Sequence, residues 1–181
     1  MKTLIRSFLL LYIIASVSFA QESIEKGTIK LAGGISYNSY WYDDENYKDH
    51  YDFSLNPQFY YFVTNNFSLG TYATYSYAKV YDRYTRTDID LTPGISYYFN
   101  YRNIYPFVFC GAGYRSTYND YSFNGTSKSW AYIIKFGCGL DFFISENISI
   151  EPYINYTTIV KTSTVKRNEV RIGIGIGNFI K

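Results

Sequence analysis

The sequence predicts an all-β fold, an eight-stranded antiparallel up-and-down barrel that crosses a membrane through its strands. Three observations predict it. Aromatic residues are abundant, with 23 Tyr and 14 Phe among 181 residues, and aromatic residues favour strands. Apolar and polar residues alternate with a period of two, and no helical period competes with this pattern. The connections between the alternating segments are short and long in turn, which is typical of a transmembrane barrel.

The first twenty residues have the features of a secretory signal peptide. Lys2 and Arg6 are followed by an apolar run over 8–17 that is too short to span a membrane as a helix. Small residues stand at Ser18 and Ala20, where a signal peptidase would read them. We therefore expect a signal peptide over 1–20 that is removed, a short N-terminal segment over 21–26 and one barrel domain over 27–181.

The composition of the mature chain excludes some functions. Without Lys2 and Arg6 the basic residues fall from 17 to 15, which equals the number of acidic residues. A neutral chain with no basic run argues against nucleic acid as a partner. The mean hydropathy of −0.18 is compatible with spanning strands, because a strand needs only about 9–11 residues, half of them apolar.

The first four alternating segments have their apolar residues at odd positions. The eight segments are 28–37, 51–63, 67–79, 87–99, 105–115, 129–143, 148–160 and 170–178. The apolar face carries Ile29, Leu31 and Ile35 in the first, Phe53, Leu55 and Phe59 in the second, Leu69, Tyr75 and Tyr77 in the third, and Ile89, Leu91 and Ile95 in the fourth. The opposite faces are polar, so each segment indicates a strand with one apolar side.

The last three segments have their apolar residues at even positions. These residues are Trp130, Ile134, Phe136 and Leu140, then Ile148, Ile150 and Ile154, then Val170, Ile172, Ile174 and Ile176. The fifth segment is ambiguous because Phe107, Val108 and Phe109 are all apolar. If glycine faces the polar side in each strand, Gly111 and Arg115 face that side too. Phe107 and Phe109 then crowd its rim, and this crowding leaves a bulge open as a feature of the strand.

The connections divide into two kinds, which indicates an up-and-down meander. Tight turns are expected at 64–66, 100–104 and 145–147, and longer polar loops at 42–50, 80–86, 118–128 and 161–168. An even number of strands places both ends of the barrel domain on the short-turn side.

The polarity of the two faces decides between a soluble lipocalin-like barrel and a membrane barrel. One face is almost wholly apolar, and the other carries about one charge per strand, which is the pattern of a membrane barrel with a polar interior. The expected polar network of the lumen consists of Lys30, Asp52, Asp88, Asp90, Lys135, Asp141, Glu151 and Arg171. Glycines such as those of "RIGIGIGN" (171–178) would make room there, because an eight-stranded barrel is only just wide enough for side chains.

These features resemble the small outer-membrane β-barrel family, the OmpA/OmpX-like eight-stranded barrels of Gram-negative envelopes. The resemblance covers 27–181 and is carried by the signal peptide, by the hairpins "YFVTNNFSLG" and "FFISENISIE", by the strand "YPFVFCGAGY" and by the final Gly/Ile strand. Such barrels usually end on an aromatic residue, whereas this chain ends "GNFIK", with Phe179 two residues early.

The resemblance implies a location and partners. It implies export through the periplasm to the outer membrane, and contact with outer-membrane lipid and lipopolysaccharide. It further implies assembly by the barrel-insertion machinery and periplasmic chaperones, and a monomer without a cofactor. Cationic residues near the long loops are candidate contacts for lipopolysaccharide phosphates: Lys79, Arg83, Arg86, Lys161, Lys166 and Arg167.

No catalytic or metal site is expected. The only histidine, His50, lies beside Asp49 and Asp52, but the nearby hydroxyls do not repeat the histidine-x-serine spacing of outer-membrane deacylases, and a solvated loop histidine is favoured. The acidic run that includes Asp43, Asp44 and Glu45 lacks the spacing of a calcium loop.

The two cysteines, Cys110 and Cys138, are expected on one face of adjacent strands. Two small lipid-facing residues are favoured over a disulfide, although the export compartment allows one. We expect a non-enzymatic outer-membrane protein that contributes to envelope integrity or surface interaction through its outer loops. A minimal pore and a secreted lipocalin-like ligand-binding barrel are the alternatives.

Overall fold

The computed structural model describes residues 24–40, 50–80, 84–101, 104–121, 125–160 and 166–181. At the strand ends 38–40, 50–51, 79–80, 84 and 166–167 it describes the backbone alone. The signal-peptide prediction for 1–20 therefore lies outside the described residues.

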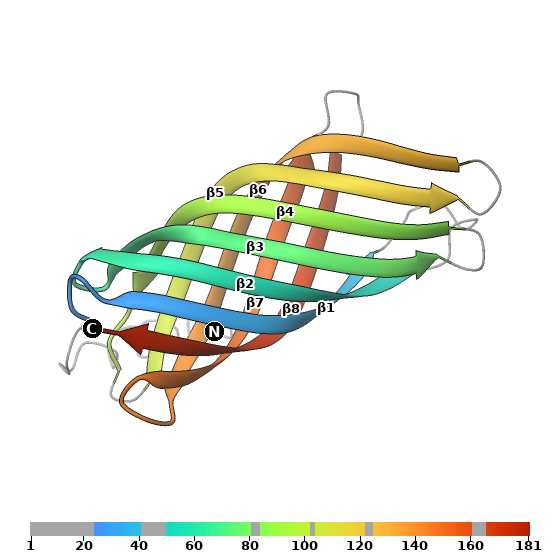
Figure 1. Cartoon of the computed structure of the whole chain (residues 1–181). Helices are drawn as coiled ribbons and strands as arrows, with labels where there is room; N and C mark the ends of the chain where they lie inside the picture. The colour runs from blue at the N-terminus through green and yellow to red at the C-terminus, as the bar shows by residue number, and fades with distance from the viewer. Residues whose placement is uncertain (1–23, 41–49, 81–83, 102–103, 122–124, 161–165) are drawn as a thin grey trace, which may run out of the picture.

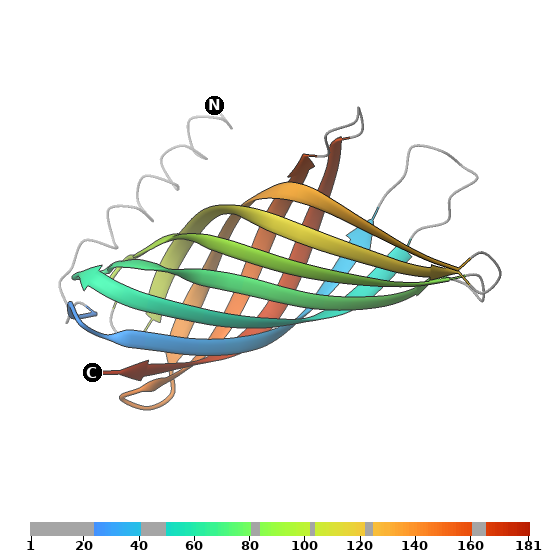
Figure 2. The ribbon, with the colours of Figure 1, turned by 45° about the horizontal axis from the view of Figure 1, so that its top comes forward.

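Eight antiparallel strands form one closed barrel, as the sequence predicts (Figure 1). The strands are β1 (Ile29–Tyr40), β2 (His50–Thr64), β3 (Phe67–Val80), β4 (Tyr84–Tyr98), β5 (Ile104–Tyr121), β6 (Gly125–Phe143), β7 (Ile148–Val160) and β8 (Lys166–Ile180). Each strand pairs with its sequence neighbours, and β1 pairs with β8 from Ile29↔Ile180 to Ser39↔Val170. Closure through this last pair leaves no edge strand in the wall, and Figure 2 shows the wall wrapping around the lumen.

None of the described residues forms a helix long and apolar enough to cross a membrane.

The barrel has a short-turn end and a long-hairpin end. The start of β1, the end of β8 and the tight turns lie at the short-turn end (Figure 1). At the other end the strands run further than the sequence analysis expects: the predicted loops 80–86 and 118–128 shorten to 81–83 and 122–124. The ladder continues through polar pairs such as Asp120↔Thr126 because backbone hydrogen bonds do not depend on apolar side chains.

The ambiguous fifth strand faces as the glycine argument predicts. Phe107, Phe109 and Arg115 are buried in the lumen, and Val108 and Tyr114 are exposed on the outer wall. The registers of β5 with both neighbours run without a shift, so no bulge is needed there. The register shift in the wall lies instead between β2 and β3, at Phe62/Thr64 beside the first tight turn.

Apolar side chains cover the outside of the wall, and charged side chains lie inside. Phe53, Ile172 and Ile176 are 70%, 63% and 63% exposed, whereas Lys30, Lys135 and Asp141 are fully buried. A soluble ligand-binding barrel would have the opposite polarity, so the structure rules out the lipocalin-like alternative.

Aromatic side chains gather on the outer wall near both ends. At the short-turn end they include Tyr61, Tyr97 and Phe99, and at the long-hairpin end Tyr37, Phe53, Tyr77, Tyr114, Trp130 and Tyr132. Several pack in pairs, such as Tyr97 with Phe99 at 5.0 Å and Tyr114 with Tyr132 at 4.9 Å between ring centroids. Two such girdles flank the apolar band of a transmembrane barrel, since an aromatic ring is apolar with a polar edge.

The segment before β1 packs against the short-turn end of the barrel. Ile24 is buried among lumenal aromatic rings, and its backbone N–H donates to the side-chain oxygen of Asn66 at 3.0 Å. The Asn66 N–H donates back to the carbonyl of Ile24 at 2.9 Å, and the Gly27 N–H donates to the carbonyl of Phe62 at 2.8 Å. Asn66 can turn the chain here because asparagine tolerates the positive φ of 66° that it adopts.

The two cysteines are free thiols on the outer wall. Cys138 pairs with Val108 and Cys110 with Phe136, so the two cysteines are diagonal neighbours on β5 and β6. Diagonal positions lie about 7–8 Å apart, beyond the reach of an unstrained disulfide.

A charge on the outer wall should destabilise the barrel. Ile154 is exposed on β7 between the two girdles, so we expect Ile154→Arg to lower the free energy of unfolding in lipid vesicles by about 2–4 kcal/mol. Thr126→Arg, at the exposed tip of β6, is the control and should change it by less than about 0.5 kcal/mol. Urea unfolding followed by tryptophan fluorescence measures both. Equal effects of the two substitutions would contradict a lipid-facing wall.

Candidate functional site

The lumen contains the charged residues that the sequence singles out, and it is the candidate site. Two ionic clusters and a set of aromatic rings occupy it along the barrel axis. We name them the Lys30 cluster, the Asp90 cluster and the lumenal rings.

The Lys30 cluster lies near the short-turn end. Its members are Lys30, Asp141 and Glu151, with Gln58 and Tyr98 bound to them. The Lys30 Nζ lies 2.8 Å from Asp141 Oδ2, also pairs with Glu151, and donates to the Tyr98 hydroxyl at 3.1 Å. Gln58 donates to the second oxygen of Glu151 at 3.1 Å. The two carboxylates and the ammonium thus have their hydrogen-bonding groups engaged away from water, as burial of charge requires.

The Asp90 cluster lies further toward the long-hairpin end. Its members are Asp90, Arg115, Lys135, Glu169 and Arg171. Arg115 holds Asp90 through both oxygens, at 2.6 and 2.8 Å, and its Nη1 donates to Glu169 at 2.5 Å. Arg171 donates to the other oxygen of Glu169 at 3.3 Å, and the Lys135 Nζ lies 3.7 Å from Asp90. The bidentate fork fixes the orientation of Arg115 as well as its charge.

These interactions join strands that are not neighbours in the wall. Lys30 on β1 reaches β6 and β7, and Arg115 on β5 reaches Glu169 on β8. Asn155 on β7 donates to the Tyr72 hydroxyl on β3 at 2.8 Å. Such bonds run across the lumen, so the axis is crossed by paired side chains at several levels.

Aromatic rings fill the lumen around the Lys30 cluster. The lumenal rings are Tyr60, Phe62, Tyr72, Tyr98, Phe107, Phe109, Tyr153 and Phe179. The Lys30 Nζ lies 5.0 to 5.3 Å from the ring centroids of Phe107, Tyr98 and Phe179, within the range of cation–π attraction. Phe107 also stacks on Tyr98 with 5.3 Å between centroids. These rings surround the ammonium with polarisable surface where the carboxylates do not reach.

The structure places the eight residues of the expected polar network inside the barrel. Lys30, Asp52, Asp88, Asp90, Lys135, Asp141, Glu151 and Arg171 are each 4% exposed or less. Six of them join the two clusters. Asp88 lies nearer the mouth, where Arg86 pairs with it at 2.7 Å and Thr117 donates to it at 2.6 Å, and Asp52 accepts from Ser54 at 3.2 Å.

Two central members of the Asp90 cluster are missing from the expected network. The glycine argument places Arg115 on the lumenal side of the fifth strand, but the expected network does not include it. Glu169 falls just before the predicted eighth strand, whereas β8 begins at Lys166. The period-two pattern contains the missing signal, since Glu169 stands two residues before Arg171 and therefore shares its face.

The candidate lipopolysaccharide contacts are only partly described. Arg86 lies on the inner face of β4 and is engaged with Asp88, so it points into the mouth of the barrel. Arg83 and Lys161 lie outside the described residues, and for Lys79, Lys166 and Arg167 the structure describes the strand position without the side chain. Lys79 pairs with Thr85 and Lys166 with Val160, both at the long-hairpin end.

The described residues hold no group of three or more His, Cys, Asp or Glu side chains arranged to bind a metal ion. The backbone of His50 pairs with Tyr40 at the start of β2, and its side chain is not described. The acidic run with Asp43, Asp44, Glu45 and Asp49 lies outside the described residues.

The closed eight-stranded wall, its outward apolar face and its ionic lumen together suit an outer-membrane barrel. Residues 7–177 match the family model of the outer membrane protein beta-barrel domain. The chain belongs to this family. Membership places the barrel in the outer membrane, with the short-turn end periplasmic and the long-hairpin end outside. No curated protein sequence matches the chain.

Solved structures of outer-membrane barrels are similar in fold. Neisserial surface protein A (NspA) has a TM-score of 0.67 at 14% identity, covering 84% of this chain and 97% of that one. Ail, the attachment invasion locus protein of Yersinia pestis, has a TM-score of 0.59 at 15% identity, covering 86% and 99%. The N-terminal β-barrel domain of Pseudomonas aeruginosa OprF has a TM-score of 0.53 at 16% identity, covering 86% and 98%. At such identities the likeness shows the fold.

Removing the central carboxylate of the Asp90 cluster should destabilise the outer-membrane barrel strongly. Asp90→Ala leaves Arg115 buried without its bidentate partner, so we expect a loss of about 3–5 kcal/mol in the free energy of unfolding. Urea unfolding in vesicles measures the loss. Asp120→Ala, at an exposed position on β5, is the matched control and should stay within about 0.5 kcal/mol of wild type. A loss for Asp90→Ala no larger than that of the control would contradict a cross-lumen cluster.

Proposed function

We propose that this outer-membrane barrel is a non-enzymatic, non-conducting protein that acts from its outer surface, in envelope integrity or surface interaction through its outer loops. The observation that carries the proposal is the set of ion pairs that cross the lumen. A solute moving along the axis would have to separate Lys30 from two carboxylates and Arg115 from two more. Breaking one buried pair costs about 3–5 kcal/mol, which opposes a steady aqueous path.

The outer end of the barrel, unlike the filled lumen, extends to where other molecules can contact it. β5 and β6 are the longest strands, with 18 and 19 residues, and they pair as far as Tyr121↔Gly125 at their outer tip. A β-strand rises about 3.3 Å per residue, and a transmembrane strand needs about 9–11 residues. The β5–β6 hairpin therefore has length to spare beyond the membrane, where its tip and the outer loops can meet other surface molecules.

Lipopolysaccharide is the partner that the proposal includes. The cations Lys79, Arg83, Lys161, Lys166 and Arg167 lie in or beside the outer connections of the chain, where lipid phosphates are within reach. Arg86 does not belong to this set, because it faces inward and pairs with Asp88. Export after cleavage of residues 1–20, assembly by the barrel-insertion machinery and periplasmic chaperones, and a monomeric state complete the proposal.

The purified outer-membrane barrel should be electrically silent. In planar lipid bilayers we expect no conductance steps, because side chains bonded across the lumen block the axis. Heat-modifiable migration of protein recovered from the same membranes shows that it was inserted and folded, and a large porin measured in the same bilayer shows that steps are detectable. Reproducible steps from the folded barrel would support the minimal pore instead.

Reversing the outer charges should weaken lipopolysaccharide binding. A variant with Lys79, Arg83, Lys161, Lys166 and Arg167 changed to Glu should retain several-fold less lipopolysaccharide on gel filtration, because phosphate contacts are replaced by like-charge repulsion. The control is Arg86→Gln, which alters a cation of the barrel mouth that faces inward, and it should retain as much as wild type. Equal retention by all three proteins would refute this contact set.

A further inference from the structure

One strand glycine faces the membrane, and packing of the lumen does not account for it. Apart from Gly125 at the first residue of β6, the other glycines of the described strands face the lumen, where an added Cβ would lie 3.1 Å or less from another atom. An added Cβ would lie 2.8 Å from the Ile174 carbonyl oxygen at Gly34 and 2.7 Å from the Ser149 hydroxyl at Gly177. At Gly33 an added Cβ would meet nothing within 4 Å. Glycine weakens a strand and often marks a place where a ligand approaches the backbone closely.

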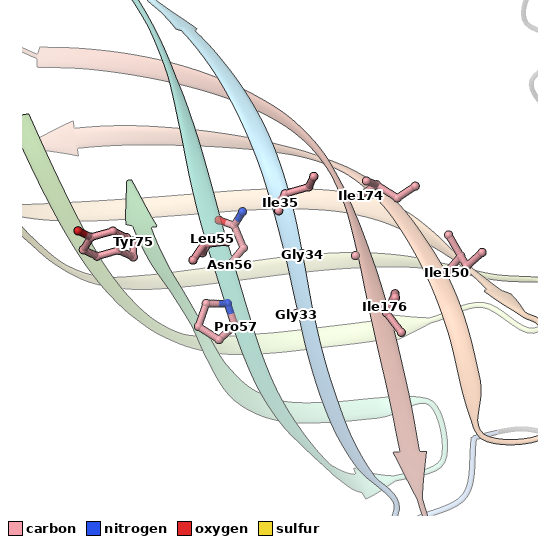
Figure 3. A pocket seen from close by; sticks show the side chains of 11 residues that line it. Gly33, Gly34, Ile35, Leu55, Asn56, Pro57, Tyr75, Ile150, Ile174 and Ile176 are labelled. Carbon is pink, nitrogen blue, oxygen red and sulfur yellow. The ribbon is translucent and has the colours of Figure 1, made fainter. Parts of the chain in front are cut away.

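Gly33 forms the floor of a groove in the outer wall. The groove has a volume of about 730 Å³. Figure 3 shows Leu55 and Pro57 of β2 on one side of Gly33 and Gly34, and Ile174 and Ile176 of β8 on the other. Gly34 pairs with Gly175 behind the floor, so the wall here is bare backbone on both faces. The groove therefore exists because side chains are missing at this point of the wall.

The apolar lining of the groove favours a hydrocarbon chain as its ligand. Its apolar lining includes Ile35, Leu55, Tyr75, Ile150, Ile174 and Ile176. Asn56 also lines the groove, but its side-chain amide donates to Ser36 in the lumen at 2.9 Å. Sites that bind polar ligands contain a few convergent polar groups, and the lining presents no such set. The groove therefore presents no set of polar groups that would bind a lipid headgroup.

The size of the groove favours an acyl chain over a second barrel. Ligand clefts measure about 300–1,000 Å³, so this groove accommodates a whole small apolar ligand, more than one side chain of a neighbouring copy would fill. In lipid, two barrels gain nothing from burying apolar surface and must associate by close packing. Two convex walls would touch at their ridges and leave the groove empty, forfeiting dispersion contacts that a flexible chain can make.

The outer edge of the groove lies one pleat from the outer aromatic girdle. Ile35 and Leu55 stand one pleat below Tyr37 and Phe53, which pack at 5.9 Å in the outer aromatic girdle. A chain that descends from a headgroup at the girdle would enter beside these residues and end over Gly33. We propose that this groove binds one acyl chain of an outer-leaflet lipopolysaccharide molecule. The inference is independent of the outer cations, because it rests on shape within the apolar band.

Photo-crosslinking in vesicles tests the proposal. The folded barrel is placed in phosphatidylcholine vesicles that contain a phosphatidylcholine with a diazirine in its acyl chain, and the crosslinked residues are mapped by mass spectrometry. Adding lipopolysaccharide should reduce crosslinks at Ile35, Leu55 and Ile174 several-fold. Crosslinks at Leu91 and Ile134, elsewhere on the outer wall, should fall only in proportion to the dilution of the probe.

Two matched variants test the role of the glycine. Gly33→Leu fills the groove and should lower crosslinking at its walls several-fold in vesicles without lipopolysaccharide. Ala112→Leu adds the same side chain at an exposed position on β5 and should leave it unchanged. Heat-modifiable migration shows that each variant is folded, and Gly33→Ala gives an intermediate loss if Gly33→Leu fails to fold.

Three outcomes would overturn the proposal. Crosslinks that fall equally at the groove and elsewhere would show that lipopolysaccharide has no preference for it. Gly33→Leu or Gly33→Ala crosslinking as wild type does would show that the groove holds no chain. Protein–protein crosslinks between groove residues of two copies would identify a second barrel as the occupant.

Discussion

The structure depends on the pairing of charged side chains in a lumen that is only just wide enough for them. A lone charge there would lose its hydration without compensation, so each cation needs carboxylates within reach and each carboxylate needs donors. Arg115 meets this condition through Asp90 and Glu169, and Lys30 through Asp141 and Glu151. The lumenal glycines belong to the same constraint, because a side chain at Gly34 or Gly177 would occupy space that the network and the backbone already fill.

This constraint also explains the register of the strands and the separate roles of the lumen and the outer surfaces. A slip of one residue in a strand would move its charges into lipid and its isoleucines into the lumen, so the network and the outer wall enforce the same register. Buried ion pairs add little net stability compared with apolar packing, so their value here is that they occupy the axis and join opposite walls. With the axis occupied, the surfaces left for interaction are the outer hairpins and the lipid-facing wall.

The segment before β1 and the last residues of β8 both pack into the periplasmic end of the barrel. Phe179 falls on the inner face of β8, where it packs with Phe62 and Phe143 and lies over Lys30. The terminal "GNFIK" therefore places its aromatic residue in the lumen, although the ending differs from that usual in similar barrels. Ile24, before β1, packs against the same lumenal aromatic rings and is held by a backbone bond to the first tight turn.

Period two in the sequence was enough to predict eight strands, their facing and the reversed polarity of a membrane barrel, because alternation along a strand is a local property. It assigned even the fifth strand, through the glycines of 111 and 113. The local sequence pattern could not predict which charged residues form ion pairs. Arg115 finds Glu169 across the lumen, 54 positions along the chain, and only barrel closure with its register brings them together. The tertiary structure likewise decided the long hairpins and the groove over Gly33. The hydrogen-bond ladder of a strand extends as far as its partner strand does, and a groove depends on side chains from neighbouring strands.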